Sequence, residues 1–314
     1  MMRAVMSITS KPDPTVVSLF AGCGGSSLGY KQAGFDVRLA VEWDTGAAKV
    51  YRRNFPGANI FEGDIADLTA EEALKAATLE PGELDVLDGS PPCQGFSTSG
   101  HRKFSDSRNR LFEEYIRMLE AFRPKMLVME NVSGLRKGKM KLIFAEMTRA
   151  LKDAGYKISC RELNAWWYGV PQRRTRLIWV GVRQDLEWSP SHPNPTQHSP
   201  LMPATALDYS IAWYEVSGFA KGLPPRSIRK RDGTKSLFPT LAAQGAGGLR
   251  RSKSSIDREG RQPGPLTIAE AKTLQGFPEW FEIYENEYKF LGNSVCPPMA
   301  EAIGRHLVTL LEEV

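Results

Sequence analysis

The chain has 314 residues, 41% of them apolar and 25% charged, which is typical of a globular protein with one large and one smaller domain. No apolar run approaches the roughly 20 residues that a membrane helix needs, and the first residues lack the apolar core of a signal peptide. The four cysteines are scattered without a CxxC pair, so we expect no metal site, no disulfide framework and a cytoplasmic location.

The net charge of +5 is unevenly distributed along the chain. Residues 221–262 contain eleven Lys and Arg against three Asp and Glu, so this segment carries +8 and the rest of the chain is net negative. The segment is either a solvated basic surface or a face that binds phosphate groups, and charge alone does not separate the two.

Strand-like and helix-like stretches alternate through the first 180 residues. Strands are predicted at residues 16–20, 37–42, 84–87, 125–129 and 176–182. Helices are predicted between them, at residues 26–33, 45–54, 108–122 and 141–152. Repeated strand–helix units predict an α/β fold with a mainly parallel sheet and helices on both faces.

The pattern changes after residue 188. Residues 189–262 are rich in Pro, Ser, Gly and Arg and predict a small irregular domain that extends to residue 289. An amphipathic helix is predicted at residues 298–311 and is expected to pack on the first domain. The predicted division is therefore a large domain of residues 1–188 plus 290–314 and a small domain of residues 189–289.

The first predicted strand runs into the glycine-rich turn FAGCGG (residues 20–25), which a helix follows. Glycines let the backbone approach a ligand closely, and a helix N-terminus offers free N–H groups. Glu42, at the end of the next strand, is placed for the hydroxyls of a ribose, and Asp64 for an adenine amine. These residues predict a site for an adenosine-containing cofactor. The turn alone does not distinguish a dinucleotide from S-adenosylmethionine, or a cofactor site from a packing turn.

The segment GSPPCQGFS (residues 89–97) follows a predicted strand and should lie at the carboxyl edge of the sheet, where α/β proteins bind ligands. Two prolines fix the backbone before Cys93, which favours a nucleophilic thiol over the small buried hydrophobe that a lone cysteine usually is. Glu130 ends another strand in ENV (residues 130–132). A thiol and an acid in one cleft suit covalent addition to a ring, with protonation at a ring nitrogen.

The segment QRRTR (residues 172–176) opens the last predicted strand of the sheet. In an extended segment Arg174 and Arg176 share one face, where they are placed either to grip a phosphate or base carbonyl or to be solvated. GNSV (residues 292–295) precedes the last helix, and its Asn293 is placed to reach the cofactor.

Taken in order, FAGCGG, EW, GDI, GSPPCQGFS, ENV, YGVPQRRTR, LQGFP and GNSV resemble the successive motifs of the DNA cytosine-5 methyltransferases of the bacterial modification type. The resemblance spans about residues 16–306, except for the variable stretch where that family carries its target-recognition region. It implies a Rossmann-like, S-adenosylmethionine-dependent methyltransferase domain, a small irregular target-recognition domain, and double-stranded DNA as the partner bound between them.

The resemblance also implies roles for individual residues. Residues that look like contacts of S-adenosylmethionine, with Trp43 stacking on adenine, are Phe20, Gly22, Gly24, Glu42, Trp43, Asp64, Ile65, Leu111 and Asn293. Cys93 looks like the nucleophile, and Glu130 like the group that holds cytosine at its ring nitrogen and amine. Arg176 looks like the contact to the cytosine carbonyl, with Arg174 beside the site.

Contacts with DNA are expected in two further places. By resemblance, Pro92 offers its carbonyl to the target amine, and Gln94 begins a loop (residues 94–107) that closes over DNA, with Ser99 helping to fill the hole left by the flipped base. In the basic segment, Arg250 and Arg251 lie beside the small loop of residues 245–248 and are expected to read guanine edges, unless they touch only the backbone.

The implied chemistry begins with the target base unstacked from the duplex. Addition of the Cys93 thiolate to carbon 6 makes carbon 5 nucleophilic, carbon 5 takes the methyl group, and a base or water then removes its proton as the thiolate leaves. Two departures from the family pattern stand out: Ser18 replaces an aspartate before LFAG, and Ala269 replaces an arginine before Glu270.

Three other classes of protein are weighed against this one. A transfer-RNA cytosine methyltransferase shares the fold, but such relatives read PPCQPFT at the nucleophile and carry a late Cys-Phe-Thr element, which this chain lacks. A catalytically silent DNA-binding protein does not need Cys93, Glu130 and Arg176, and a nicotinamide-dependent dehydrogenase leaves GSPPCQG and ENV unexplained. We expect a monomer at the nucleoid that acts either alone, as a solitary methylase, or beside a restriction endonuclease of the same target sequence that it does not bind.

Overall fold

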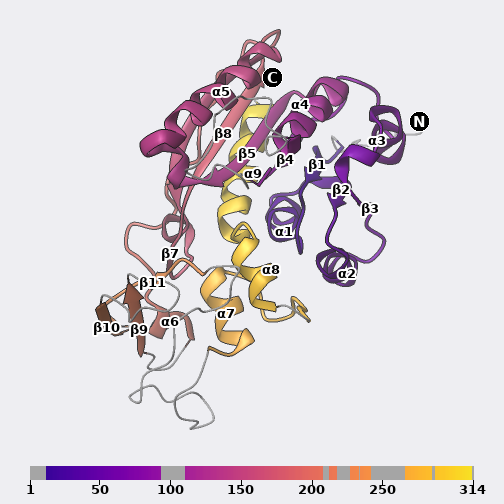
Figure 1. Cartoon of the computed structure of the whole chain (residues 1–314). Helices are drawn as coiled ribbons and strands as arrows, with labels where there is room; N and C mark the ends of the chain where they lie inside the picture. The colour runs from indigo at the N-terminus through magenta and orange to yellow at the C-terminus, as the bar shows by residue number, and fades with distance from the viewer. Residues whose placement is uncertain are drawn as a thin grey trace, which may run out of the picture.

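A seven-stranded sheet forms the centre of the larger part of the molecule (Figure 1). The structure is a computed structural model that describes residues 12–92, 110–207, 212–217, 227–232, 234–241, 266–284 and 287–312. The strands of this sheet are β1 (Thr15–Leu19), β2 (Asp36–Glu42), β3 (Ile60–Glu62), β4 (Val86–Gly89), β5 (Met126–Val132), β6 (Tyr156–Asn164) and β8 (Thr175–Arg183). Their order across the sheet is β3-β2-β1-β4-β5-β8-β6.

The sheet is mainly parallel, which confirms the fold class predicted from the sequence. Strands β1 to β5 run parallel to one another, whereas β8 is antiparallel to both β5 and β6. The sequence does not predict β6, because most side chains of this edge strand are half-buried or exposed and form no continuous apolar run.

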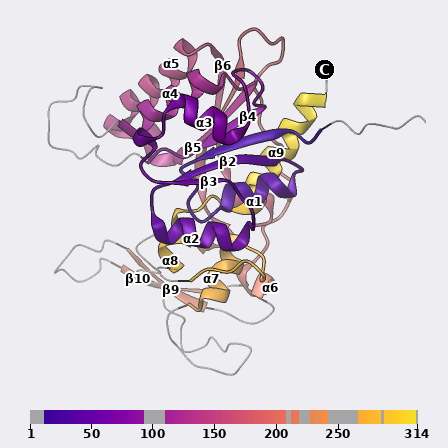
Figure 2. The same ribbon diagram turned by 90° about the vertical axis from the view of Figure 1, so that its right-hand side faces the viewer.

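Helices cover both faces of the sheet (Figures 1 and 2). They are α1 (Gly25–Gln32), α2 (Thr45–Asn54), α3 (Ala70–Ala77), α4 (Arg110–Phe122), α5 (Lys141–Asp153) and α9 (Pro297–Glu312). Short 3₁₀ turns join these elements: η1 (Ile65–Asp67), η3 (Ser133–Arg136), η4 (Gly138–Met140) and η5 (Ala165–Tyr168). No helix within the described ranges is both long and apolar enough to cross a membrane.

Alternate side chains of each strand point to opposite faces and build two separate cores. On one face, Leu87, Leu127 and Trp179 pack under α3, α4 and α5. On the other face, Val86 and Val128 pack against α1 and α9. Because the strands are buried on both faces, their short apolar runs are recognisable in the sequence.

Helices α1 and α9 lie in direct contact although they come from opposite ends of the chain. A Cβ on Gly29 would stand 2.5 Å from the Cβ of Ala300, so the two helix backbones approach more closely than any larger residue allows. The predicted return of the last helix, expected at residues 298–311, is therefore confirmed.

The smaller part of the molecule lies below the sheet in Figure 1 and consists of short elements. They are α6 (Pro203–Leu207), β9 (Ala212–Ser217), β10 (Ser227–Asp232), β11 (Phe238–Pro239), α7 (Ile268–Gln275) and α8 (Glu287–Asn293). Strands β9 and β10 form an antiparallel pair, and β11 pairs with β7 (Gln172–Arg173). Helix α8 spans the domain boundary expected at residues 289 and 290, and that boundary stays a prediction.

The core of this smaller part continues onto the larger one. Phe238, Leu274 and Phe281 belong to the same buried cluster as Tyr51 of α2 and Phe55, which follows that helix. The two parts are therefore joined by a buried apolar contact beneath the glycine-rich turn, and not only by the chain segments that connect them.

Candidate active site

Glycines and a carboxylate from the neighbouring strand shape the turn after β1. Gly22 and Gly24 have φ values of +57° and +97°, in the left-handed region that favours glycine. The Gly22 amide donates to Oε2 of Glu42 at 2.7 Å, and the Asp44 amide donates to Oε1 of the same carboxylate at 2.8 Å. Burial raises the pKa of Glu42, which is 7% exposed, although the two amides lower it.

Three residues with expected cofactor roles lie around the ends of β2 and β3. Trp43 is 77% exposed, so one large apolar ring is left uncovered beside Glu42. Asp64 caps η1 by accepting from the Ala66 amide at 3.0 Å, and its other oxygen lies 3.1 Å from the Arg110 guanidinium. Ile65 is buried, and its side chain belongs to the core on one face of the sheet.

The open space at this turn suits an adenosine-containing cofactor. A Cβ built on Gly22 meets no atom within 4 Å, so the turn faces open space. Glu42 and Trp43 are neighbours at this turn. The carboxylate of Glu42 suits two hydroxyl groups, and the exposed indole of Trp43 suits an aromatic base. Phe20, with φ of +57°, and half-buried Leu111 pack on the core beneath the site.

The segment before α9 lies against the same turn. The Ser294 hydroxyl is 2.9 Å from the Cys23 thiol, and a Cβ on Gly25 would stand 2.3 Å from the carbonyl oxygen of Val295. Asn293 beside them is exposed. The structure thus brings the expected cofactor residues from both ends of the chain to one edge of the sheet.

Glu130 and Arg176 form an ion pair at the carboxyl end of β5. The Arg176 Nε atom lies 2.7 Å from Oε1 of Glu130, and the two side chains are 11% and 14% exposed. In the register of the sheet Arg176 is opposite Val132, two residues beyond Glu130, so the pair lies on one face. A guanidinium at this distance fixes the orientation of the carboxyl group.

Asn131 is a residue of this site that the sequence analysis does not single out. Its Nδ2 donates to the carbonyl oxygen of Pro91 at 3.0 Å, and its side chain is buried. This hydrogen bond fixes the segment after β4 to the end of β5, so Pro92 and Glu130 lie at neighbouring strand ends. The motif ENV could have indicated this residue, because Asn131 directly follows the acid Glu130 in it.

Several expected site residues fall outside the described residues. These are Cys93, Gln94, Ser99, Arg250 and Arg251. Pro92, the last described residue before them, is exposed, whereas Pro91 is buried. Their assignments remain predictions from the sequence.

The structure buries Arg174, whereas Arg176 pairs with Glu130, and the expected contacts of both arginines with the substrate stay predictions. Strand β8 begins at Thr175, and Arg174 lies between β7 and β8, where its carbonyl oxygen accepts from the Ala165 amide at 2.9 Å. Its guanidinium is 1% exposed and donates to the carbonyl oxygens of Leu241 at 3.1 Å, Gly292 at 2.9 Å and Ser294 at 2.8 Å. Burial lowers the pKa of Arg174 to about 10. Arg174 therefore positions three backbone segments.

Two buried glutamines extend this polar cluster. Gln172 Nε2 donates to Oε1 of Gln275 at 2.8 Å, and Gln172 Oε1 accepts from the Leu241 amide at 2.9 Å. Gln275 in turn donates to the carbonyl oxygen of Ser294 at 3.0 Å. The cluster joins the smaller part of the molecule to the segment that contacts the cofactor turn.

We predict that Gln172→Leu lowers the free energy of unfolding by about 2 kcal/mol or more, because buried partners of the lost amide remain unsatisfied. Urea unfolding followed by fluorescence measures this change. Gln184→Leu is the matched control, because Gln184 is exposed and its side chain is not part of the cluster. Equal unfolding midpoints for both variants would contradict this role.

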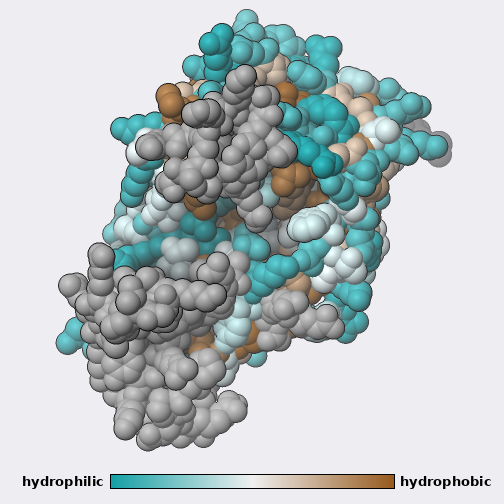
Figure 3. All heavy atoms as spheres, viewed as in Figure 1, coloured by the Kyte–Doolittle hydropathy of each residue, from teal (hydrophilic) through white to brown (hydrophobic). Residues whose placement is uncertain are grey.

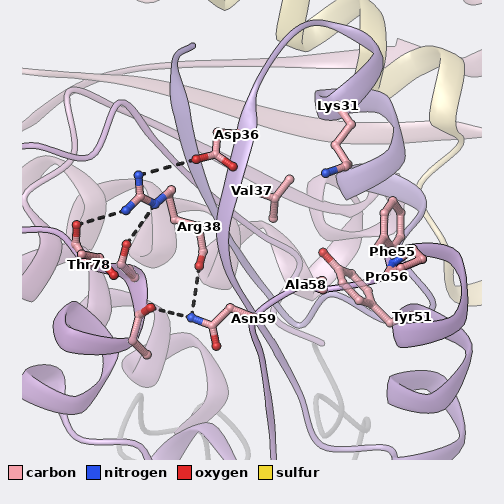
Figure 4. Close-up of a pocket in the computed structure, with 13 residues that line it drawn as sticks. Lys31, Asp36, Val37, Arg38, Tyr51, Phe55, Pro56, Ala58, Asn59 and Thr78 are labelled. Atoms are coloured by element: carbon pink, nitrogen blue, oxygen red, sulfur yellow. Dashed lines mark hydrogen bonds and ion pairs between the residues drawn. The ribbon is translucent and has the colours of Figure 1, made fainter. Parts of the chain in front are cut away.

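A separate cavity of about 300 Å³ lies at the other end of β2 (Figure 4). Its polar groups bind one another: the Arg38 guanidinium donates to the carbonyl oxygens of Ala77 at 3.0 Å and Thr78 at 3.2 Å, and lies 3.5 Å from Asp36. Because Glu42 ends the same strand, this cavity is remote from the candidate site.

The sheet order, the glycine-rich turn and the acid at the end of β2 define a Rossmann-like fold of S-adenosylmethionine-dependent methyltransferases. The chain belongs to the family of C-5 cytosine-specific DNA methylases, whose model matches residues 14–309.

Similar proteins span nearly the whole chain. The Type II methyltransferase M.XorII of Xanthomonas oryzae pv. oryzae is 30% identical, covering 96% of this chain and 86% of its own length. The Type II methyltransferase M1.HphI of Haemophilus parahaemolyticus is 31% identical, covering 94% of this chain and 87% of its own length.

Solved structures agree on the fold. A protein described as a DNA modification methyltransferase encoded within an E. coli prophage matches with a TM-score of 0.72 and 27% identity, covering 95% of this chain and 99% of that one. Spodoptera frugiperda DNMT2 matches with a TM-score of 0.67 over 94% and 100% of the two chains, and at 20% identity this likeness concerns the fold alone.

Proposed function

We propose that the protein transfers a methyl group from S-adenosylmethionine to carbon 5 of a cytosine in a specific sequence of duplex DNA. The observation that carries this proposal is the Glu130–Arg176 pair, together with the hydrogen bond from Asn131 to the carbonyl oxygen of Pro91, two residues before Cys93. An acid in a fixed orientation can hold a pyrimidine by the edge of its ring. The segment of the cysteine lies beside it, so the thiol can attack the ring of the same base. Transfer RNA is the less favoured substrate, because the matching family acts on DNA.

S-adenosylmethionine supplies an electrophilic methyl group when it is bound. We assign the ribose hydroxyls to Glu42, the face of the adenine ring to Trp43 and the adenine amine to Asp64. Phe20, Gly22, Gly24, Ile65, Leu111 and Asn293 complete the proposed cofactor site. The position of these residues around one open turn supports the assignment.

The protein groups act on the flipped base in a defined order. The Cys93 thiolate forms a bond to carbon 6, while Glu130 holds the ring nitrogen and the amine and Arg176 holds Glu130 and the base carbonyl. Pro92 offers its backbone carbonyl to the amine. After carbon 5 has gained the methyl group, its proton passes to a base or water, and the bond between carbon 6 and sulfur breaks.

Bisulfite sequencing of DNA from a host without cytosine methylation tests the proposal, because 5-methylcytosine resists conversion. Expression of the protein should protect cytosines in one sequence context, and expression of Cys93→Ser at the same level should protect none. Complete conversion in the presence of folded wild-type protein would contradict the proposed reaction.

We further propose that residues 189–289 form the target-recognition domain and that duplex DNA lies between this domain and the sheet. In the view of Figure 3, hydrophilic side chains occupy much of the described surface between these two parts. Arg136, Lys137 and Lys141 are exposed just beyond Glu130, where they are placed for phosphates that flank the target base.

We predict that exchanging residues 189–262 for the corresponding segment of a relative with a different target sequence changes the methylated sequence. The motif residues act on any flipped cytosine, so discrimination has to come from the segment outside them, with Arg250 and Arg251 proposed to read bases. Bisulfite sequencing reads the outcome. Continued methylation of the original sequence by an active chimera would place recognition elsewhere.

The Type II methyltransferases among the relatives support a restriction endonuclease of the same sequence specificity as a functional partner, without physical binding. We propose that the protein acts as a monomer on DNA at the nucleoid of the cytoplasm. One target base for each catalytic site requires no second subunit.

A further inference from the structure

Asp88 is a buried carboxylate that none of the roles above uses. It is 6% exposed and lies one residue before the end of β4. Its Oδ2 accepts from the Ser18 hydroxyl at 3.2 Å, and its Oδ1 accepts from the Tyr30 hydroxyl at 3.2 Å. The Ser26 hydroxyl lies 3.5 Å from that of Ser18, so three hydroxyl groups gather around one carboxylate.

The hydroxyl groups come from both sides of the glycine-rich turn. Ser18 precedes residues 20–25 in β1, and Ser26 and Tyr30 follow them in α1. Ser18 and Asp88 are register partners in the parallel pair of β1 and β4. One carboxylate on β4 is therefore bonded to the entry and the exit of the turn.

The charged and titratable groups around Asp88 include no cation among the described residues. They are Tyr30 of α1, Tyr51 of α2, Tyr115 of α4 and Glu130 of β5, and no described cation forms an ion pair with it. Burial raises the pKa of Asp88 to about 6, although hydrogen bonds from Ser26, Tyr30 and Ser18 lower it.

The ionised form of Asp88 therefore opposes folding. Because the pKa is raised above the ordinary value of 3.8, the stability that this group contributes is present at low pH and is lost as the pH rises through about 6. Removing the charge therefore removes this destabilising contribution at neutral pH.

We propose that Asp88 is a positioning residue, whose ionised carboxylate fixes the cofactor-binding turn of residues 20–25 relative to the end of β4. A carboxylate accepts from all three hydroxyl groups, whereas an amide or a protonated acid turns a donor toward at least one of them. The inference rests on the proposed cofactor role of the turn. It also gives Ser18 a function, as the donor that joins the turn to Asp88.

Binding of S-adenosylhomocysteine to the DNA-free protein, followed by calorimetry, tests this role without a turnover assay. Asp88→Asn should weaken binding about tenfold at pH 7.5, as for the loss of a charge-assisted hydrogen bond, while the melting temperature stays the same or rises. Wild-type affinity should fall as the pH drops through about 6. The affinity of Asp88→Asn for S-adenosylhomocysteine should change less over this pH range, because only the titration of Glu42 then affects binding.

Two further variants sharpen the test. The double variant Ser18→Asp/Asp88→Ser moves the carboxylate across the register pair and should recover most of the affinity. Asp85→Asn is the matched control: this carboxylate accepts from Thr15 at the other end of the same strands and pairs with Lys125 at 2.7 Å, so its loss should lower stability and leave binding unchanged.

Wild-type affinity in Asp88→Asn at pH 7.5, or identical pH profiles, would overturn the inference and leave the proposed function intact. A melting temperature that falls together with affinity, without recovery in the double variant, would assign Asp88 a structural role and also overturn it. Failure of the wild-type protein to bind S-adenosylhomocysteine would contradict the proposed function instead.

Discussion

Replacing Cys93 with serine is expected to abolish methyl transfer and to leave the affinity for S-adenosylmethionine nearly unchanged. A hydroxyl group does not add to carbon 6 of cytosine at neutral pH, whereas a thiolate does. The proposed cofactor contacts, by contrast, come from the ends of β1, β2 and β3 and from α4 and α8, and not from residues 90–109. Methyl incorporation into duplex DNA and calorimetric binding of the cofactor measure the two quantities separately.

A trapping experiment sharpens this result. A duplex with 5-fluorocytosine at the target position should form a stable covalent adduct with the wild-type protein, because fluorine does not leave carbon 5 as a proton does. Peptide mapping should locate the adduct at Cys93, and Cys93→Ala should form none. Absence of an adduct under conditions where ordinary DNA is methylated would contradict the covalent route.

Replacing Glu130 with glutamine is expected to slow the chemical step by about 10²-fold or more, the usual loss when a positioned acid–base group is removed. The amide keeps the shape of the carboxyl group but loses its ion pair with Arg176 and its ability to exchange a proton with the ring nitrogen. Single-turnover kinetics with the cofactor and DNA saturating isolate this step from binding.

Duplex affinity should change much less than the rate in the Glu130 variant, because most contacts to DNA are made elsewhere. Glu162→Gln is a suitable control, since Glu162 is an exposed carboxylate of the edge strand β6. Near-normal turnover in Glu130→Gln would show that another residue holds the base.

The features of this protein that were predicted correctly depend on short-range patterns in the sequence. Buried parallel strands appear as short apolar runs, and glycines with acids at strand ends mark a ligand edge, so the sheet and the cofactor turn were recognisable. The resemblance added the identity of the reaction, which periodicity does not contain.

Contacts between distant residues were not predictable in this way. Nothing local in the chain says that Gln172, Gln275 and Ser294 share hydrogen bonds, because these residues meet only after the chain has folded. The three carbonyl groups that accept from Arg174 were not predictable for the same reason, because they belong to residues 67 or more positions away in the chain.

The contact between α1 and α9 has a consequence for the synthesis of the protein. Helix α1 leaves the ribosome early, but the face that carries Gly29 has no partner until Ala300 and its neighbours have been translated. Throughout elongation this face, and the Val86 side of the sheet behind it, are exposed to other nascent chains and to chaperones. A message cut short before residue 297 would therefore yield an aggregation-prone fragment rather than a weaker enzyme.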